Sequence, residues 1–180
     1  MKLVVAATGA SGALYTQRLL DNLSGHEVHF ISTHHAKEVQ TLELPGGLKI
    51  PAGVTVYEEH GSMFVPFVSG SAKFDAMVVI PASMGTIGRI ANGTSDTTIA
   101  RAADVFLKER RKLILVPRES PYSLIHLRNM IAITEAGATI IPASPSFYGG
   151  AATITDLLDT IVARILDHLG IAHKLAKRWV

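Results

Sequence analysis

The 180-residue sequence contains no cysteine, so it can form neither a disulfide bond nor a thiolate nucleophile. It also lacks any apolar run near the ~20 residues that a membrane-spanning helix needs, so no membrane partner is expected. No secretory leader precedes the first apolar residues, and we therefore expect a cytoplasmic location. The 8 histidines do not have the spacing of metal ligands, which predicts that the protein has no metal site.

Charge is scarce as well. Charged residues make up 18% of the chain and hydrophobic residues 48%, with a formal net charge of +2. The basic residues are scattered rather than gathered in a stripe, which argues against a nucleic-acid partner. We expect residues 1–180 to form one domain with its own core, because the chain is long enough for one. The low charge predicts that part of the surface is buried in a homo-oligomer.

What the sequence does contain is a regular alternation of short apolar segments and helical patterns. This alternation predicts a doubly wound, mostly parallel α/β sheet with helices on both faces. Between them, the stretch 45–71 is rich in glycine and proline, and we expect a hairpin there with a strand at 54–58. Ser95 or Asp96 is the expected cap of the fourth helix. The expected strands are 3–7, 26–32, 76–80, 113–116 and 139–141, and the expected helices are 13–23, 34–44, 86–92, 97–111, 123–136 and 153–169.

The chain is organised around residues 81–86, where a purely apolar strand gives way to hydroxyl-bearing and glycine residues. In a parallel sheet, the loops after successive strands meet at one edge, where ligands bind. Hydroxyl groups, glycine N–H groups and one arginine at that edge suit a phosphorylated ligand such as a mononucleotide. The polar residues expected there are Ser11, Thr33, Ser83, Thr86, Arg118, Glu119 and Tyr148.

Plainer interpretations remain open for some of these residues. The loop 8–12 lacks the full G-x-G-x-x-G pattern, so it is also compatible with a plain turn in which Ser11 caps the following helix. Arg118 and Glu119 are also compatible with a local ion pair.

Motifs along nearly the whole chain resemble one family, the flavin prenyltransferases, long labelled as decarboxylases of hydroxybenzoate or phenylacrylate type. Two of these motifs are Pro81-Ala82-Ser83-Met84-Gly85-Thr86 and Val116-Pro117-Arg118-Glu119-Ser120-Pro121. The others lie at 8–12, 90–96, 101–105, 107–111, 126–130, 145–148 and 164–166.

The resemblance implies a flavodoxin-like, Rossmann-type fold and a metal-independent transferase. Such an enzyme joins the dimethylallyl group of dimethylallyl phosphate to N5 and C6 of reduced FMN. The product, prenylated FMN, then serves a separate decarboxylase of the ubiquinone-pathway type. Members of the family form dodecamers built from trimers. The residues do not distinguish the phosphate from the diphosphate donor, nor a dodecamer from a trimer.

The resemblance also assigns roles to residues. Glu119 is expected to protonate the leaving phosphate, while Glu43 with Ser11 takes up the proton released at C6. Trp179 is expected to cover the site. Ser62 stands where some members have a large aromatic residue, for which Phe64 or Phe67 would substitute, and Ala82 replaces a common cysteine. The residues implied to hold FMN are Gly9, Ala10, Ser11, Thr33, Ser83, Met84, Gly85, Thr86 and Arg118. Those implied to hold the prenyl phosphate, partly from neighbouring subunits, are Lys108, Glu119, Tyr148 and Arg164.

Three other functions compete with this one. A peptidyl-cysteine decarboxylase would share the fold, but its usual Pro-x-Met-Asn clamp is absent and Pro145-Ser146-Phe147-Tyr148 stands instead. A nicotinamide-dependent dehydrogenase would use the Gly9 loop, yet the second strand offers no acidic partner for a ribose. A flavin-binding accessory subunit would bind FMN without changing it covalently.

Overall fold

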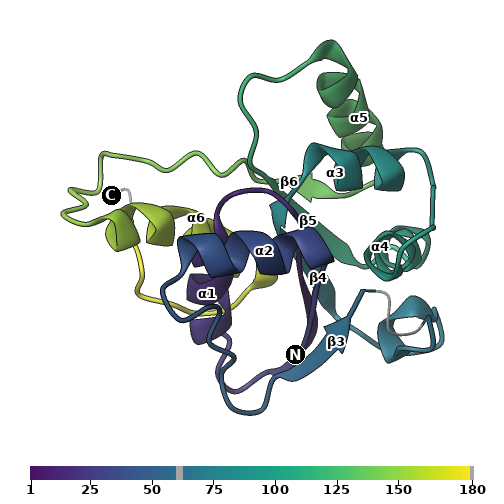
Figure 1. Ribbon diagram of the computed structural model, residues 1–180, viewed down its shortest axis with the longest axis horizontal. Coiled ribbons are helices and arrows are strands. Elements are labelled where there is room, and N and C mark those ends of the chain that lie inside the picture. Colours follow the sequence, from purple (N-terminus) through teal and green to yellow (C-terminus); the bar gives the residue numbers. More distant parts are fainter. Residues whose placement is uncertain (60–62, 179–180) are drawn as a thin grey trace.

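The computed structural model describes residues 1–59 and 63–178, and it is built on a six-stranded sheet whose neighbouring strands all run parallel (Figure 1). The strand order is β3-β2-β1-β4-β5-β6. The strands are β1 (Lys2–Ala7), β2 (Glu27–Ser32), β3 (Thr55–Glu58), β4 (Ala76–Ala82), β5 (Lys112–Pro117) and β6 (Thr139–Ile140).

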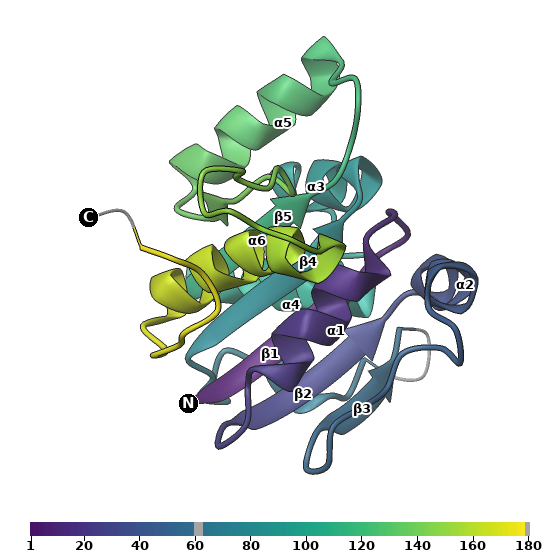
Figure 2. The ribbon, with the colours of Figure 1, turned by 90° about the vertical axis from the view of Figure 1, so that its left-hand side faces the viewer.

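Helices cover both faces of the sheet, as predicted (Figures 1 and 2). Helices α1, α2 and α6 pack on one face, while α3, α4, α5 and the short 3-10 helix η1 pack on the other. The sheet is therefore buried on both sides, and all seven residues of β4 are buried. The helices are α1 (Ala13–Asp21), α2 (His34–Glu43), η1 (Pro66–Val68), α3 (Met84–Ala91), α4 (Thr98–Lys108), α5 (Leu124–Glu135) and α6 (Ile154–Leu169).

In the segment 45–71 the strand expected at 54–58 is present as β3, but the expected hairpin was wrong. No hairpin forms at β3; instead β3 pairs in parallel with β2 and makes the edge of the sheet. A parallel neighbour needs a long crossover, and here it consists of helix α2 followed by the glycine- and proline-rich stretch 45–54. After β3, Phe67 of η1 packs against the rings of His29, Tyr57 and Phe74.

Helix ends follow local capping chemistry. Helix α4 is capped by Thr97, whose side chain accepts a hydrogen bond from the N–H of Ala100 at 3.1 Å, so the expected caps Ser95 and Asp96 were wrong. Helix α6 begins with a capping box between Thr153 and Asp156. It ends at Gly170, which is in the left-handed conformation (φ 79°).

One buried ion pair joins the helices that carry the two concave regions described below. The guanidinium of Arg18 on α1 donates from Nε and Nη2 to the two carboxylate oxygens of Asp159 on α6, at 2.8 and 2.7 Å. The Asp159 side chain is only 8% exposed. Because the pair is bidentate, it fixes the direction of α6 relative to α1.

The strand order places the switch point of the sheet between β1 and β4. From β1 the chain moves outward to β2 and β3, and then returns to β4 on the other side of β1. The loops after β1 and β4 lead to helices on opposite faces of the sheet, and in open α/β sheets ligands bind between such loops at the carboxyl edge, a region called the crevice below.

Candidate active site

One buried hydroxyl joins the loops after β1 and β4. Thr8 is 1% exposed, and its Oγ1 donates to the carbonyl oxygen of Pro81 at 2.9 Å while accepting from the N–H of Ser83 at 2.7 Å. The N–H of Thr8 also donates to the oxygen of Pro81, at 3.1 Å. Leaving these groups without partners would be costly, so Thr8 fixes the spacing between the two loops that form the crevice.

Helix α3 begins in this crevice. Ser83 is its N-cap: the hydroxyl accepts from the N–H of Thr86 at 3.4 Å and lies 3.1 Å from the Thr86 hydroxyl. The N–H groups of Met84 and Gly85 belong to the first turn, where a helix offers no acceptor of its own. The Met84 side chain is 6% exposed and packs in the core, so it contributes only main-chain atoms. Two hydroxyls and two N–H groups at the positive end of a helix dipole can bind a phosphate.

The loop 9–12 lies against the start and the end of α2. A β-carbon at position 9 would come within 2.7 Å of the β-carbon of His35, so this close approach requires glycine. At the other end of α2, one oxygen of Glu43 accepts from the N–H groups of Gly12 and Ala13, at 2.9 and 2.7 Å. Gly12 is thus the N-cap residue of α1, and Ser11 is not.

The same contacts determine the charge of Glu43. Partial burial raises the pKa of its carboxyl, but hydrogen bonds from the Ser11 hydroxyl and the N–H groups of Gly12 and Ala13, with the charge of Arg118, outweigh this and lower the pKa below its ordinary value. Glu43 is therefore ionised at neutral pH. The Ser11 hydroxyl connects it to the crevice, so the pair can pass a proton.

Arg118 and Glu119 follow β5 at the same edge of the sheet. The Nε of Arg118 donates to the carbonyl oxygen of Ser11 at 3.1 Å. This hydrogen bond joins the loop after β5 to the loop after β1. Glu119 is half-buried and accepts from the N–H of Ser120 at 3.0 Å. In the described part of the chain no ion pair joins Arg118 to Glu119, so the local ion pair considered from the sequence does not form, and each side chain bonds a main-chain group instead.

Two of the residues predicted to hold FMN also make contacts within the protein that support the loops. The hydroxyl of Thr33 caps α2 by accepting from the N–H of Ala36 at 3.0 Å. Ala10 is 8% exposed, and its N–H donates to the oxygen of Thr8 at 2.7 Å. Both residues shape the crevice, and their donor and acceptor groups are largely used within the protein.

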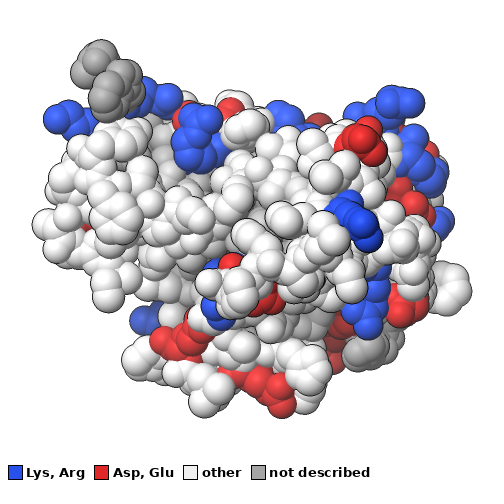
Figure 3. Space-filling model, turned by 90° about the horizontal axis from the view of Figure 1, so that it is seen from above, with Lys and Arg blue, Asp and Glu red and all other residues white. Residues whose placement is uncertain are grey.

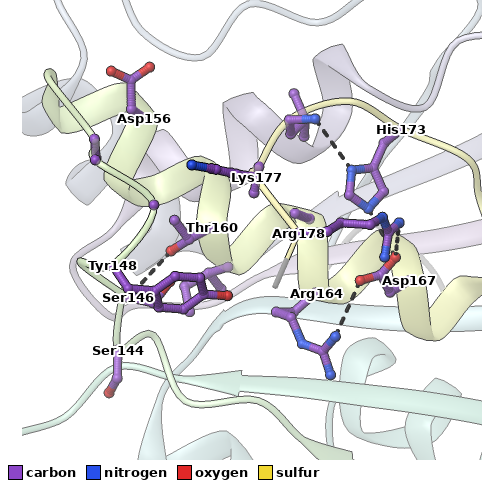
Figure 4. Close-up of a pocket in the computed structure, with 17 residues that line it drawn as sticks. Ser144, Ser146, Tyr148, Asp156, Thr160, Arg164, Asp167, His173, Lys177 and Arg178 are labelled. Carbon is purple, nitrogen blue, oxygen red and sulfur yellow. Dashed lines mark hydrogen bonds and ion pairs between the residues drawn. The ribbon is translucent and has the colours of Figure 1, made fainter. Parts of the chain in front are cut away.

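A second concave region lies beside α6. It is a pocket of about 620 Å³ lined by the loop 144–151, by α6 and by the tail segment 173–178 (Figure 4). Tyr148 and Arg164 line this pocket, together with Lys177 and Arg178. The lining of this pocket does not include the crevice loops 8–12, 83–86 and 118–119. The structure thus brings Tyr148 and Arg164 together, but apart from the crevice.

Lys108 belongs to neither region. It is the last residue of α4, only a few residues before the start of β5, and so lies at the opposite, amino edge of the sheet. Its ammonium group lies 2.5 Å from a carboxylate oxygen of Glu109. Within one chain, Lys108 therefore does not meet the other residues predicted to hold the prenyl phosphate.

Of Phe64 and Phe67, the two residues expected to substitute for the family's large aromatic residue, Phe67 is excluded from that role. Phe67 is 1% exposed in the core and therefore cannot line a ligand site, whereas Phe64 is 99% exposed. Ser62 and Trp179 lie outside the described residues.

Sequence reasoning missed two residues, Thr8 and Asp167. Thr8 was included in a motif but given no role, although a threonine directly after a buried strand is well placed to bond a neighbouring loop. Asp167 accepts hydrogen bonds from three side chains beside the pocket. Its position three residues after Arg164, one helical turn further on, was the available signal.

In residues 1–59 and 63–178, no group of three or more His, Asp or Glu side chains is placed to hold a metal ion. In the same residues, no helix combines the length and the apolar character needed to cross a membrane.

The Flavoprotein family model matches residues 1–166. Among characterised proteins, the flavin prenyltransferase UbiX of Methanocaldococcus jannaschii is 46% identical over 181 residues, which cover 99% of this chain and 98% of that protein. The chain belongs to the flavin prenyltransferase family.

Solved structures of flavin prenyltransferases agree with the fold. A crystal structure of AnUbiX (PadA1) in complex with FMN and dimethylallyl pyrophosphate superposes with a TM-score of 0.92 at 40% identity, covering 99% of this chain and 97% of that one. A dodecameric FMN-dependent UbiX-like decarboxylase from Escherichia coli O157:H7 has a TM-score of 0.93 at 40% identity, with full coverage of both chains (100% each).

Proposed function

We propose that this flavin prenyltransferase family member transfers the dimethylallyl group of dimethylallyl phosphate to N5 and C6 of reduced FMN. The observation that carries the proposal is the crevice at the switch point of the sheet. There the start of α3, the Arg118 guanidinium and the Ser11–Glu43 pair converge at one edge. This arrangement occurs in a chain 46% identical to a flavin prenyltransferase.

The crevice fits a flavin mononucleotide by its chemistry. The start of α3 offers N–H groups and the Ser83 and Thr86 hydroxyls to the phosphate. Gly9 permits the close approach of the loop after β1 to the start of α2. Arg118 offers a planar set of donors to the electron-rich edge of the ring system. AnUbiX, with a TM-score of 0.92, was crystallised with FMN.

The allylic phosphate needs a positively charged environment that one chain does not assemble at the crevice. Tyr148 and Arg164 lie in the pocket beside α6, and Lys108 lies at the opposite edge of the sheet. We therefore propose that neighbouring subunits bring these three residues to Glu119 of the crevice. The dodecameric state of the Escherichia coli relative supports a shared site of this kind.

The residues of the chain have distinct tasks in this reaction. When the allylic C–O bond breaks, phosphate leaves and an allylic cation remains. Arg164, Lys108 and the Tyr148 hydroxyl stabilise the phosphate charge, and Glu119 in its protonated form donates a proton to the leaving oxygen. The flavin supplies the nucleophilic N5 and C6. Bonding at N5 releases the N5 proton, and closure at C6 adds one proton to the dimethylallyl double bond and releases the proton of C6, which the Ser11 hydroxyl would pass to the ionised Glu43.

The surface is consistent with assembly into an oligomer. The face shown in Figure 3 has broad areas without charged side chains. Exposed apolar residues are frequent on α5, in the loop before α6 and at the first residue of α6. These residues are Leu124, Ile125, Leu127, Ile131, Phe147 and Ile154. A homododecamer would cover such a surface.

The product and its location complete the proposal. A single flavin-binding domain, residues 1–180, would make prenylated FMN and pass it to a decarboxylase that uses this cofactor. Because the flavin must stay reduced until it reacts, we propose the reducing cytoplasm as the compartment.

The test is anaerobic incubation of the purified protein with reduced FMN and dimethylallyl phosphate, followed by mass spectrometry of the released flavin. We expect a flavin heavier than FMN by one C5H8 unit. Recovery of unmodified FMN alone would favour a flavin-binding accessory subunit. Release of CO2 from a peptide ending in cysteine would favour the decarboxylase alternative, which the absent Pro-x-Met-Asn segment disfavours.

A further inference from the structure

Three side chains converge on Asp167 in the last turn of α6 (Figure 4). One carboxylate oxygen, Oδ2, accepts from Nη1 of Arg164 at 3.2 Å. The other, Oδ1, accepts from Nη2 of Arg178 at 2.8 Å and from Nε2 of His173 at 3.1 Å. One oxygen therefore holds a residue of the helix, and the other holds two residues of the tail that follows it.

The hydrogen bonds also determine the proton position on His173. Its Nδ1 accepts from the N–H of Leu175 at 3.3 Å, so Nδ1 carries no proton and Nε2 is the donor to Asp167. The His173 side chain is 5% exposed, and Leu175 packs against the core. The first part of the tail is thus anchored, and Arg178 continues it along the pocket wall.

This carboxylate lies among the cationic residues of the pocket. Arg164, Lys177 and Arg178 all line it, and the side chain of Arg164 is 62% exposed. The pKa of Asp167 is lowered, first by the hydrogen bond from Arg178, so the carboxylate is ionised over the neutral range. Its charge balances two guanidinium groups that would otherwise repel each other a few ångströms apart.

We propose that Asp167 is a positioning residue for prenyl transfer: it holds Arg164 and the tail segment 173–178 as one wall of the pocket that receives the phosphate of the donor. This proposal rests on the proposed function, because the phosphate is that of the allylic donor. Arg164 contacts the phosphate, while Asp167 acts through Arg164 and Arg178 and touches no reacting atom.

If Asp167 only stabilised the fold, its substitution would have different effects from those expected for a positioning residue. The side-chain amide of asparagine has a single oxygen, whereas all three neighbours of Asp167 are donors. In Asp167→Asn, either Arg164 or the Arg178–His173 pair would face an NH2 group, and the charge would be lost. Helix α6 would remain, because Thr153, Asp156 and Gly170 fix its ends and Asp159 ties it to α1.

The experiment compares Asp167→Asn with the unaltered protein. We expect the KM for dimethylallyl phosphate to rise by about 10-fold or more, while kcat at saturating donor and the affinity for FMN change by less than about 3-fold. We also expect faster tryptic cleavage after Lys174 or Lys177, measured without any substrate. Arg178→Gln should shift both readouts in the same direction, and Arg178→Lys should recover part of the loss.

The matched control is Asp96→Asn, which removes a carboxylate paired with Arg89 at 3.3 Å outside the pocket. It should leave the KM and the cleavage rate unchanged. An unchanged KM in Asp167→Asn, or a fall in kcat and FMN affinity together, would overturn the proposal. If the unaltered protein makes no prenylated flavin, the proposed function fails, whereas the proteolysis still tests whether Asp167 holds the tail.

Discussion

The crevice and the pocket differ in what holds them in place. The crevice is built on strand ends, and its central tie, Thr8, is 1% exposed. The pocket is built from a loop, one side of a helix and a tail, and its main cation, Arg164, is 62% exposed. A site fixed by buried hydrogen bonds keeps its geometry in a single chain. A site that depends on exposed ion pairs gains little from them alone and needs further contacts.

This difference suggests that the crevice and the pocket have different tasks, flavin binding in the crevice and binding of the donor phosphate in the pocket. We expect the crevice to bind and orient a flavin before any other subunit is present. The pocket presents its charges outward, where a second copy of the chain can use them. We therefore expect flavin binding and prenyl transfer to be separable by mutation. The predictions below test that separation, in order of decreasing effect.

The largest effect concerns the sharing of one site between subunits. Glu119→Gln removes the acid of the crevice, and Arg164→Met removes the cation of the pocket. Each variant alone should lose about 100-fold or more of prenyl transfer while retaining FMN. In assemblies mixed at equal amounts, about a quarter of the sites should combine an intact Glu119 with an intact Arg164 from different chains. Transfer measured by mass spectrometry should then rise far above that of either variant.

The outcome contrary to this prediction is also clear. If Glu119 and Arg164 of one chain served the same site, every site in the mixture would carry one defect. Mixing would then give only the average of the two variants. Subunit exchange must be verified, for example by native mass spectrometry of the mixed assemblies, before the activities are compared.

The sequence predicted the fold well because its strands are buried on both faces. Such strands are short apolar runs, although β4 and β5 continue to Ala82 and Pro117, past the ends predicted at residues 80 and 116. The family was also predicted correctly. The edge strand β3 was predicted at nearly its observed position, but its pairing was wrong, because residues 55–58 are mostly exposed and show no pattern that indicates which neighbour they pair with.

The site residues that could be predicted from the sequence also depend on the strands. Positions directly after strands, such as Ser83 and Arg118, could be placed at one edge, because parallel strands bring their ends together. Lys108 and Arg164 lie on helices that run back from that edge, so their distance from the crevice depends on helix length and packing. Thr8 was missed because a buried hydroxyl in a loop has no distinctive pattern in the sequence.

A smaller effect is expected from Thr8→Val, which removes the tie between the two loops of the crevice. The N–H of Ser83 loses its acceptor, and Pro81 loses one of its donors. We expect the free energy of unfolding to fall by about 1–3 kcal/mol. FMN affinity should fall as well, because the start of α3 is no longer fixed. Calorimetric titration with FMN and urea denaturation at fixed protein concentration measure the two effects.

Thr16→Val is the matched control for this variant. Thr16 is also buried, and its hydroxyl donates to the carbonyl oxygen of Ile80 at 2.7 Å, but it bonds no part of the loop 83–86. This change should cost a similar amount of stability and leave FMN affinity nearly unaltered. Equal losses of FMN affinity in both variants would mean that Thr8 acts only through overall stability.

The smallest effect is a pH dependence that belongs to the crevice and concerns Glu43. Its pKa is lower in the folded chain than in the unfolded one, so the stability it contributes is present above about pH 4.3, the ordinary pKa of a glutamate, and is lost as the pH falls through the folded value. Glu43→Gln should therefore reduce the free energy of unfolding by less than about 1 kcal/mol at pH 7, because the side chain is largely exposed. The difference between the two proteins should shrink on acidification in urea titrations at pH 7 and pH 4. A difference that stays constant with pH would show that the capping of Gly12 and Ala13 does not depend on the charge of Glu43, and the proton transfer assigned to it would lose its support.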